Sequence, residues 1–173
     1  MAQAGHLNIR QNPTMPITKA PSPRRRHDNL QLDRQLCFAL YSASHAMTRS
    51  YKRALAAVGL TYPQYLVMLV MWDQDGIGIS EIAKTLGLDT PSVTPLVQRL
   101  EVAGLVKRVR LPGDDRVSSM KVQPKGWAIQ KQVADIQKGI ACRTGLEGAE
   151  FDRLRAALLE VAARMNPALD GVE

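Results

Sequence analysis

The residue types best suited to chemistry in this 173-residue chain are one cysteine and three tyrosines near its beginning. Cys37 is predicted in the second turn of a helix, one turn from Arg34, and both the positive end of the helix dipole and the guanidinium favour a thiolate. Tyr41, Tyr51 and Tyr62 follow, and each phenol can donate a hydrogen bond to a thiolate or to an oxidised sulfur. The pattern indicates a reactive thiol. The alternative is that Cys37 packs in the core as a small apolar side chain.

Tyr51 and Cys37 are too far apart to meet within one helix. A helix rises about 1.5 Å per residue, so Tyr51 lies about 21 Å beyond Cys37. An antiparallel pair of first helices from two subunits would bring the two residues together, and this predicts a thiol site within a homodimer interface. Ordinary interface packing is the alternative for the tyrosines, above all for Tyr41.

The second cysteine and the three histidines complete the set of potential ligands. Cys142 falls in a predicted C-terminal helix, far from Cys37 in sequence, and His6, His27 and His45 show no metal-ligand spacing with either thiol. We therefore expect no metal and no cofactor. The segment Gly76-Ile77-Gly78 lacks the third glycine of a dinucleotide site and is predicted as a loop between helices.

Residues 79–122 predict a pair of crossed helices followed by a two-stranded hairpin. Apolar residues recur at helical spacing in both helices: Ile79, Ile82, Ala83 and Leu86, then Val93, Leu96, Val97 and Leu100. Gly87 falls at the turn between the helices, where positive φ carries no Cβ penalty. Any small helical domain can contain such a pair, but the hairpin that follows favours a winged helix-turn-helix.

The second helix of this pair and the hairpin carry side chains suited to DNA. Those expected to contact the major groove are Ser92, Thr94, Gln98 and Arg99. Residues 106–110 and 118–122 are predicted as strands, joined by a turn over 111–116. Between Lys107 and Lys125 there are six basic residues, Arg110 among them, and two acidic ones, so a local charge of about +4 would attract phosphates.

The remaining segments are predicted to form an arm and a dimerisation region. Residues 1–27 contain four prolines and end in three arginines, which predicts a disordered arm that either touches DNA phosphates or is dispensable. Residues 28–173 are expected to form one domain, with dimerisation helices over 28–60 and 124–166 and the winged unit over 61–123. The first helix should begin at a cap made by Asp28 and Gln31 and end near Gly59.

Composition limits the class of protein. A net charge of +7 and a pI near 9.7 suit a polyanionic partner, and 45% hydrophobic residues with only 5% aromatic ones favour a mainly α protein. No stretch approaches the ~20 apolar residues that cross a bilayer, and no signal peptide is visible. We expect a cytoplasmic protein without a membrane partner.

Five short segments resemble the organic-hydroperoxide-sensing branch of the MarR family of repressors. They are residues 36–42 (LCFALYS), 60–65 (LTYPQY), 94–96 (TPL), 99–101 (RLE) and 114–116 (DDR), within a likeness over roughly 32–158. The resemblance implies that Cys37 is the thiol that peroxide oxidises and that Tyr51 and Tyr62 hydrogen-bond it across the dimer. It also implies that Asp114 and Arg116 order the wing in the minor groove, and Cys142 is placed like the resolving cysteine of two-cysteine members. The exit of the wing departs from the family pattern, because residues 120–126 (MKVQPKG) stand where the family usually has an apolar-Leu-Thr run before the glycine, and Gln123 is a poor N-cap.

The resulting hypothesis is a homodimeric repressor that holds a palindromic operator while Cys37 is reduced and releases it after oxidation by an organic hydroperoxide. One alternative is a MarR-type regulator gated by a small aromatic ligand, with both cysteines idle. Another is a thiol peroxidase, which is disfavoured because peroxiredoxin-like sites carry a hydroxyl residue where this chain has Arg34. We therefore expect that the protein is not an enzyme.

Overall fold

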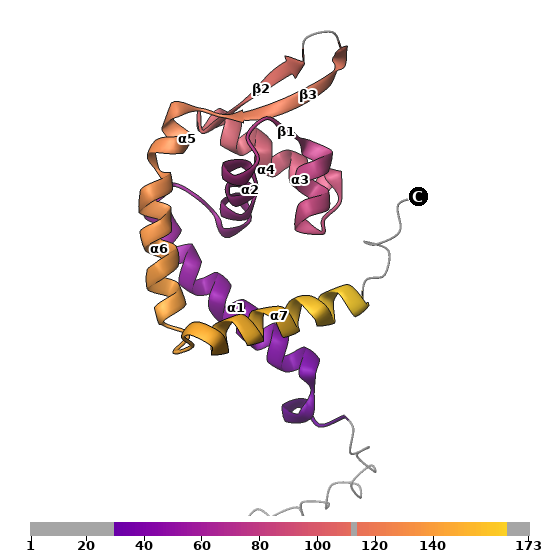
Figure 1. The fold of residues 1–173 in the computed structure, drawn as a ribbon, viewed down its shortest axis with the longest axis vertical. Coiled ribbons are helices and arrows are strands. Elements are labelled where there is room, and N and C mark those ends of the chain that lie inside the picture. The colour runs from indigo at the N-terminus through magenta and orange to yellow at the C-terminus, as the bar shows by residue number, and fades with distance from the viewer. Residues whose placement is uncertain (1–29, 112–113, 166–173) are drawn as a thin grey trace, which may run out of the picture. The chain divides into compact units, whose positions relative to one another are not determined.

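The computed structural model describes residues 30–111 and 114–165, and it describes side chains except those of residues 110–118. The described part is mainly helical and carries one small sheet (Figure 1). In chain order the elements are η2 (Leu32–Arg34), α1 (Leu36–Leu55), η3 (Ala56–Val58), α2 (Tyr62–Asp73), β1 (Ile77–Gly78), α3 (Ile79–Leu86), α4 (Thr90–Val102), β2 (Val106–Leu111), β3 (Asp114–Val122), α5 (Pro124–Ala128), α6 (Gln130–Cys142) and α7 (Gly148–Met165). The predicted arm, residues 1–27, lies outside the described residues.

The first helix is shorter than the sequence suggested. A single 3-10 turn precedes α1, and Gln35 separates the two because its backbone is extended, with ψ of 121°. Cys37 is therefore in the first turn of α1, where the prediction had placed it in the second. Asp28, the expected cap, is outside the described residues, whereas the predicted end near Gly59 is confirmed by the left-handed φ of 69° there. The contacts divide the chain into residues 1–40 and 41–173, with the boundary inside α1.

Helix α2 forms the centre of the second unit. Its start is a capping box: the Gln64 backbone N–H donates to the Thr61 hydroxyl, and the Gln64 side chain accepts from the Thr61 backbone N–H at 2.9 Å. Nearly every following residue is apolar, and most of the helix is buried, but Leu69 remains 42% exposed.

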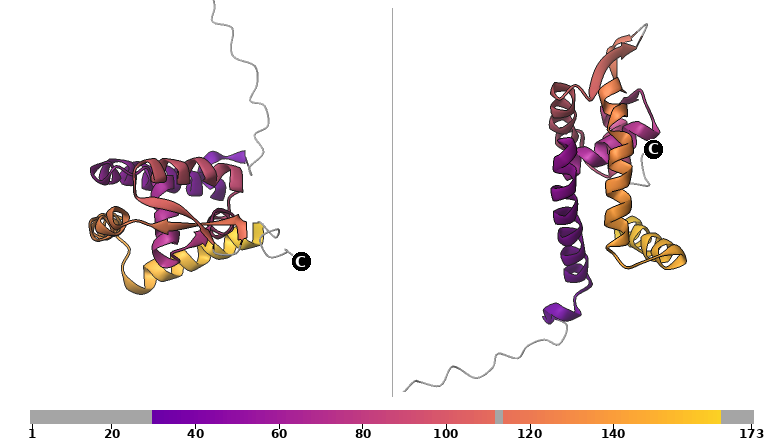
Figure 2. Two further views of the ribbon diagram at one scale, coloured as in Figure 1. Left: turned by 90° about the horizontal axis from the view of Figure 1, so that it is seen from above. Right: turned by 90° about the vertical axis from the view of Figure 1, so that its left-hand side faces the viewer.

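The sheet has three antiparallel strands in the order β1-β3-β2. Val106 pairs with Val122 and Arg110 with Ser118, so the hairpin has the predicted alignment, but both strands extend into the predicted turn. The prediction of a loop at 76–78 was wrong, because Ile77 pairs with Met120 and makes β1 a strand. Figure 2 shows β2 and β3 projecting beyond the helices of their unit as a ribbon.

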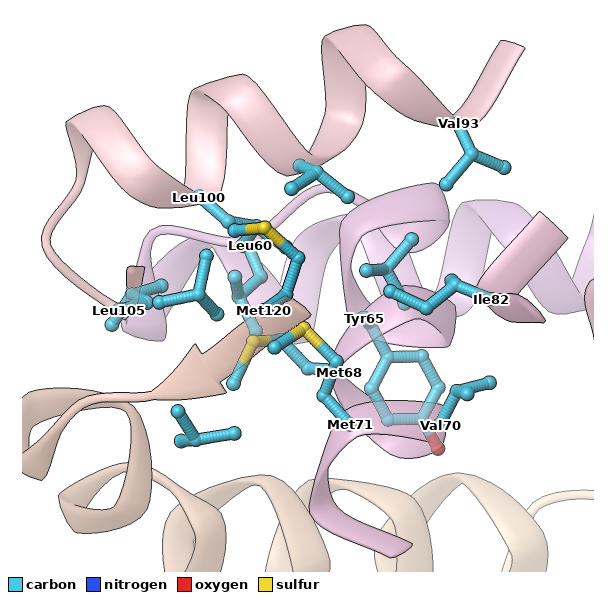
Figure 3. Packing of buried hydrophobic residues seen from close by; sticks show 14 of the residues in the cluster. Leu60, Tyr65, Met68, Val70, Met71, Ile82, Val93, Leu100, Leu105 and Met120 are labelled. Atoms are coloured by element: carbon cyan, nitrogen blue, oxygen red, sulfur yellow. The ribbon is translucent and has the colours of Figure 1, made fainter. Parts of the chain in front are cut away.

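One hydrophobic core joins the helix pair, α2 and the base of the hairpin (Figure 3). Met68 and Met71 from α2, Ile82 from α3, Leu100 from α4 and Met120 from β3 are all fully buried. At about 25 cal/mol per Å² of apolar surface removed from water, each such side chain contributes roughly 1.5–3 kcal/mol. The helix pair and the hairpin therefore share one core and are held at a fixed mutual orientation.

The C-terminal region is broken more often than predicted. Pro124 opens a helix as expected, but the run bends at Ile129 into α5 and α6, and α7 follows after Gly145, whose φ is 70°. The N-cap Gln123 makes no side-chain capping bond, as its residue type predicted. Within the described residues none of α7 is buried, and its large exposed apolar side chains are Leu154, Leu158, Leu159 and Met165.

Candidate nucleic-acid interface and thiol site

The turn between α3 and α4 is built as the sequence predicted. Gly87 adopts φ of 65°, and its N–H donates to the carbonyl of Lys84 at 3.1 Å. The next N–H, of Leu88, donates to the carbonyl of Ala83 at 2.9 Å. These two bonds satisfy carbonyls at the end of α3 and turn the chain sharply into α4, so the two helices form the crossed pair of a helix-turn-helix.

The N-terminus of α4 is fixed by Asp89. Its Oδ1 accepts from the backbone N–H of Ser92 at 3.0 Å, and hydrogen bonding with Ser92 lowers the pKa of Asp89 below its usual 3.8. The Asp89 carboxylate is fully exposed, so its negative charge faces solvent at neutral pH. It thereby satisfies an N–H at the positive end of the α4 dipole.

The predicted groove-contacting side chains of α4 are divided between solvent and the helix itself. Ser92, Gln98 and Arg99 are exposed, on the side away from the buried Val93, Val97 and Leu100. Thr94 is half-buried and its hydroxyl donates to the carbonyl of Thr90 at 2.8 Å, so only its acceptor capacity is left for a partner. Pro95 lies inside the helix, where it removes one backbone donor.

The base of the wing is tied to the helices by side chains that the sequence did not single out. Asp75 Oδ1 accepts from the backbone N–H of Val122 at 2.8 Å, and Trp72 Nε1 donates to the carbonyl of Gly126 at 3.2 Å. A Cβ on Gly126 would overlap the carbonyl oxygen of Leu105. Only glycine therefore lets α5 approach the start of β2 this closely.

The wing presents basic residues to solvent. Lys107, Arg108 and Lys121 are exposed, and the backbone N–H of Arg108 donates to Glu101 at the end of α4 at 3.0 Å. That bond links α4 directly to β2. The side chains of Arg110, Asp114 and Arg116 lie outside the described ones, so their part in the interface stays a prediction.

Two of the predicted thiol-binding tyrosines lie together in a cluster with a third that the prediction missed. The ring centroids of Tyr51 and Tyr62 are 5.2 Å apart, and Tyr65 stacks on Tyr51 at 5.1 Å with an interplanar angle of 23°. Tyr51 and Tyr65 are buried, whereas Tyr62 is half-buried. In the sequence Tyr65 was hidden within the apolar run of α2, and its spacing of three from Tyr62 was the available signal.

The cluster raises the pKa of two of its phenols. Burial and the nearby Tyr51 raise the pKa of Tyr62, and burial followed by a hydrogen-bonding interaction with Tyr51 raises the pKa of Tyr65 well above 10.0. Both therefore remain protonated at neutral pH and serve as hydrogen-bond donors. Tyr41 does not join them: it is 61% exposed and contacts His45 edge to face at 4.1 Å.

Both cysteines are free thiols exposed to solvent. Cys37 is the second residue of α1, and Cys142 is the last residue of α6. The exposure of Cys37 argues against the alternative in which it acts as a buried apolar side chain. No cluster of three or more metal-ligating side chains occurs within residues 30–111 and 114–165.

None of the described helices is by itself long and apolar enough to cross a bilayer. Residues Leu36–Val58 and Tyr62–Asp73, which are bent by 71° relative to each other, meet the length and composition test only when they are joined.

A capped helix exposed at the end of a helix-turn-helix and linked to a basic hairpin defines a winged helix-turn-helix, a class of DNA-binding protein. The sequence model of the MarR family matches residues 60–118, which contain this unit. The chain belongs to the MarR family of transcriptional regulators, a result that confirms the family resemblance.

Three known proteins are similar to this chain over most of its length. It is 41% identical over 80% of its length to the HTH-type transcriptional regulator TtmR of Methylorubrum extorquens, covering 69% of that protein. It is 33% identical over 76% of its length to the organic hydroperoxide resistance transcriptional regulator of Bacillus subtilis, covering 89% of that protein. Reduced AbfR bound to DNA matches with a TM-score of 0.63 and 29% identity over 78% of this chain and 93% of that one. In its disulfide form AbfR matches with a TM-score of 0.57 and 28% identity, over 81% and 93% respectively.

Proposed function

We propose that this MarR-family regulator is a homodimeric repressor whose Cys37 senses organic hydroperoxides. The observation that carries the proposal is the exposed Cys37 in the first turn of α1, in a chain 33% identical to a regulator of organic hydroperoxide resistance. Cys37 is the second residue of α1, and the thiolate is the nucleophilic form of cysteine. The similar protein AbfR has been solved in a reduced form bound to DNA and in a disulfide form, and these two forms support the proposal of a redox switch.

The proposed chemistry has two steps. The Cys37 thiolate attacks the outer oxygen of the hydroperoxide; an S–O bond forms, the O–O bond breaks, and the departing alkoxide takes a proton to become an alcohol. The thiolate of Cys142 from the partner subunit then attacks the sulfenic sulfur, so that an S–S bond forms and hydroxide leaves as water after protonation. One hydroperoxide and two thiols thus yield one alcohol, one water and one disulfide.

Exposed apolar surface supports the dimer. The apolar side chains that α1 and α7 leave exposed include Leu36, Phe38, Met47, Leu154 and Leu158. Exposed large apolar side chains gathered on two helices favour association, because burying them in an interface removes them from water. Two copies related by a two-fold axis would present two α4 helices about 34 Å apart, which suits a palindromic operator.

DNA release would follow from the geometry of the disulfide. Its two Cα atoms must come within about 7 Å, so the bond constrains the ends of α1 and α6 that carry the two thiols. The wing leads into α5 and, after the break at Ile129, into α6, and hydrogen bonds from Trp72 and Asp75 tie Gly126 and Val122 to the end of α2. Strain at the thiols would therefore reach the DNA-binding unit through rigid elements.

A groove in the second unit favours ligand gating as the second candidate. It holds about 580 Å³ and is lined by Tyr65, Leu69 and Trp72 from α2 and by Val133, Ala134 and Gln137 from α6. Its size and apolar walls suit a small aromatic molecule. In this case a phenolic compound would release DNA without any change at sulfur.

The variant Cys37→Ser separates the two candidates. Operator fragments are first selected from random duplexes by the reduced wild-type protein, and mobility shifts are then recorded with cumene hydroperoxide or with salicylate. The thiol switch predicts that Cys37→Ser binds DNA within about threefold of wild type and no longer responds to the peroxide. Release by salicylate in both proteins, with no response to peroxide in either, would contradict the switch and support ligand gating.

A further inference from the structure

A cleft in the second unit, between α1 and the end of α6, is lined mainly by cations. It holds about 670 Å³, and its lining residues are Ala46, Arg49, Ser50, Lys52, Arg53 and Arg143. We call it the basic cleft. We propose that the basic cleft binds the phosphate groups of a small phosphorylated effector that carries at least two negative charges. This binding does not depend on the oxidation of Cys37.

The charges of the basic cleft have no negative partner in the part of the chain that the structure describes. No carboxylate lines the cleft, and its four cations are Arg49, Lys52, Arg53 and Arg143. Over residues 30–111 and 114–165 the ion pairs lie within α7, and none of them involves these four side chains. Four positive charges therefore face one space that holds no counter-charge of its own.

The spacing of the cations on α1 makes them repel each other. Arg49, Lys52 and Arg53 stand at positions i, i+3 and i+4, so they share one face of the helix. Like charges at this spacing destabilise a helix. Arg143, the C-cap of α6, adds a fourth positive charge to the same cleft. An anion bound among them would offset this repulsion.

The helix dipoles explain only part of this arrangement. Cations are favourable near a helix C-terminus, and Lys52 and Arg53 lie in the last turn of α1, while Arg143 caps α6. Arg49 lies outside the last turn of α1, where the effect of the dipole has faded. The dipoles also do not explain why two helices direct their cations into one cleft. A bound anion accounts for both features.

The residue types and the volume define the class of ligand. Three of the four cations are arginines, whose planar guanidinium groups bind phosphate through two parallel hydrogen bonds. Four cations exceed what a single negative charge can satisfy, so the ligand carries several. The volume falls in the range of about 300–1,000 Å³ that is typical of sites for small organic molecules. A phosphorylated small molecule fits these properties better than an isolated ion.

The phosphates of the operator are a second possible source of the same chemistry. Helix α6 has 13 residues, so its two ends lie about 20 Å apart, and Arg143 follows the end that is remote from the wing (Figures 1 and 2). A duplex held by α4 and the wing therefore lies away from the basic cleft. This placement favours a free molecule as the source of the phosphate.

Calorimetry with inorganic pyrophosphate tests the site directly. The reduced full-length protein at about 150 mM salt should bind one pyrophosphate per subunit with a micromolar dissociation constant, and inorganic phosphate at least tenfold more weakly. Arg53→Gln and Arg143→Gln should each weaken pyrophosphate binding roughly tenfold, the value of one hydrogen bond to a charged group. Lys138→Gln is the matched control and should bind as wild type does, because Lys138 is an exposed cation of α6 that does not line the cleft.

Thermal unfolding separates a lost ligand contact from a damaged fold. Without pyrophosphate and at low salt, Arg53→Gln should unfold at a temperature no lower than wild type, because one repulsive charge has been removed. Pyrophosphate should raise the unfolding temperature of wild type and of Lys138→Gln more than that of Arg53→Gln. Equal stabilisation of all three proteins by pyrophosphate would contradict a site at the basic cleft.

Three other results would overturn the proposal. Absence of pyrophosphate binding to wild type, or equal weakening in Lys138→Gln and Arg53→Gln, would show that the cations form no specific site. A fall of about one in the salt dependence of operator binding in Arg53→Gln would show that the cleft contacts DNA phosphates instead. A weaker dimer in Arg53→Gln would show that the partner subunit fills the cleft. None of these measurements involves Cys37, so failure of the thiol switch would leave them unchanged.

Discussion

The single residue Asp89 fixes the N-terminal end of α4. Its carboxylate accepts the Ser92 N–H, and its pKa lies below 3.8 in the folded chain. A group with a lowered folded pKa contributes stability that is present above its unfolded pKa and is lost as the pH falls through its folded one. The cap therefore weakens only in acid.

Replacing Asp89 with asparagine tests this predicted loss of stability at low pH. Asparagine caps helices about as well but does not titrate. The free energy of unfolding of wild type minus that of Asp89→Asn should fall as the pH is lowered from about 5 to about 3, since other carboxyls titrate equally in both proteins. Urea unfolding at both pH values measures it, and a pH-independent difference would show that the cap carries no charge-dependent stability.

Cys142 is the residue proposed to attack the oxidised sulfur of Cys37. The proposal predicts that wild type treated with one equivalent of hydroperoxide forms a disulfide-linked dimer, whereas Cys142→Ser stops at a sulfenate on Cys37. Non-reducing electrophoresis and peptide mass spectrometry distinguish these products. A linked dimer of unchanged yield in Cys142→Ser would exclude Cys142 as the second thiol.

The sequence singled out candidate site residues where the residue type alone suggests the chemistry. Cys37, Tyr51 and Tyr62 stood out because thiols and phenols are rare in this chain. Tyr65 was missed because it lies in a run of apolar residues, where a tyrosine is typical of packing. The bond of the Thr94 hydroxyl to its own helix was also hidden, since the same hydroxyl can face the groove or the backbone.

At the scale of elements, the wing depends on how closely α5 approaches the start of β2. Gly126 sits at this contact, with the backbone of Leu105 in the space that a side chain would need. Backbone atoms cannot rotate aside as a flexible side chain can, so the strand itself must shift to admit a methyl group.

Gly126→Ala should therefore lower the free energy of unfolding by about 1–3 kcal/mol and weaken DNA binding by displacing the wing. Gly139→Ala is the matched control, because Gly139 lies inside α6 and a Cβ added there would meet nothing within 4 Å. It should raise the free energy of unfolding by about 0.5–1 kcal/mol through helix propensity. Urea denaturation measures the free energy of unfolding of both variants. Equal changes in the two would show that the contact between Gly126 and the backbone of Leu105 does not require glycine.

Element boundaries were predictable where local chemistry decides them and not where pairing does. The left-handed Gly87 and the end of the first helix near Gly59 follow from neighbours in sequence, so both were predicted. Strand β1 has only two residues and exists because Met120 lies beside Ile77, a contact that no local pattern reveals. The break between α5 and α6 was also missed, because the residue at the break is Ile129 and not a glycine or proline.

For the whole molecule, the exposed apolar side chains of α7 are the basis of the predicted dimer. Leu158→Glu places a charge among them and should weaken the dimer at least tenfold, because an unpaired carboxylate is costly to bury. Ala156→Glu adds the same charge about 200° around the helix and should leave the dimer intact. Sedimentation of both variants gives the answer, and a monomeric wild type would refute the dimer outright.

The most direct test of the thiol switch follows the oxidation of Cys37 and the release of DNA in the same sample. Wild-type protein bound to its selected operator is titrated with cumene hydroperoxide, and at each addition the oxidised fraction of Cys37 and the fraction of released DNA are measured together. If oxidation of Cys37 releases the operator, the two fractions rise in parallel, reach completion near one equivalent of hydroperoxide per subunit, and fall together when dithiothreitol is added. Full oxidation of Cys37 while the operator stays bound would contradict it.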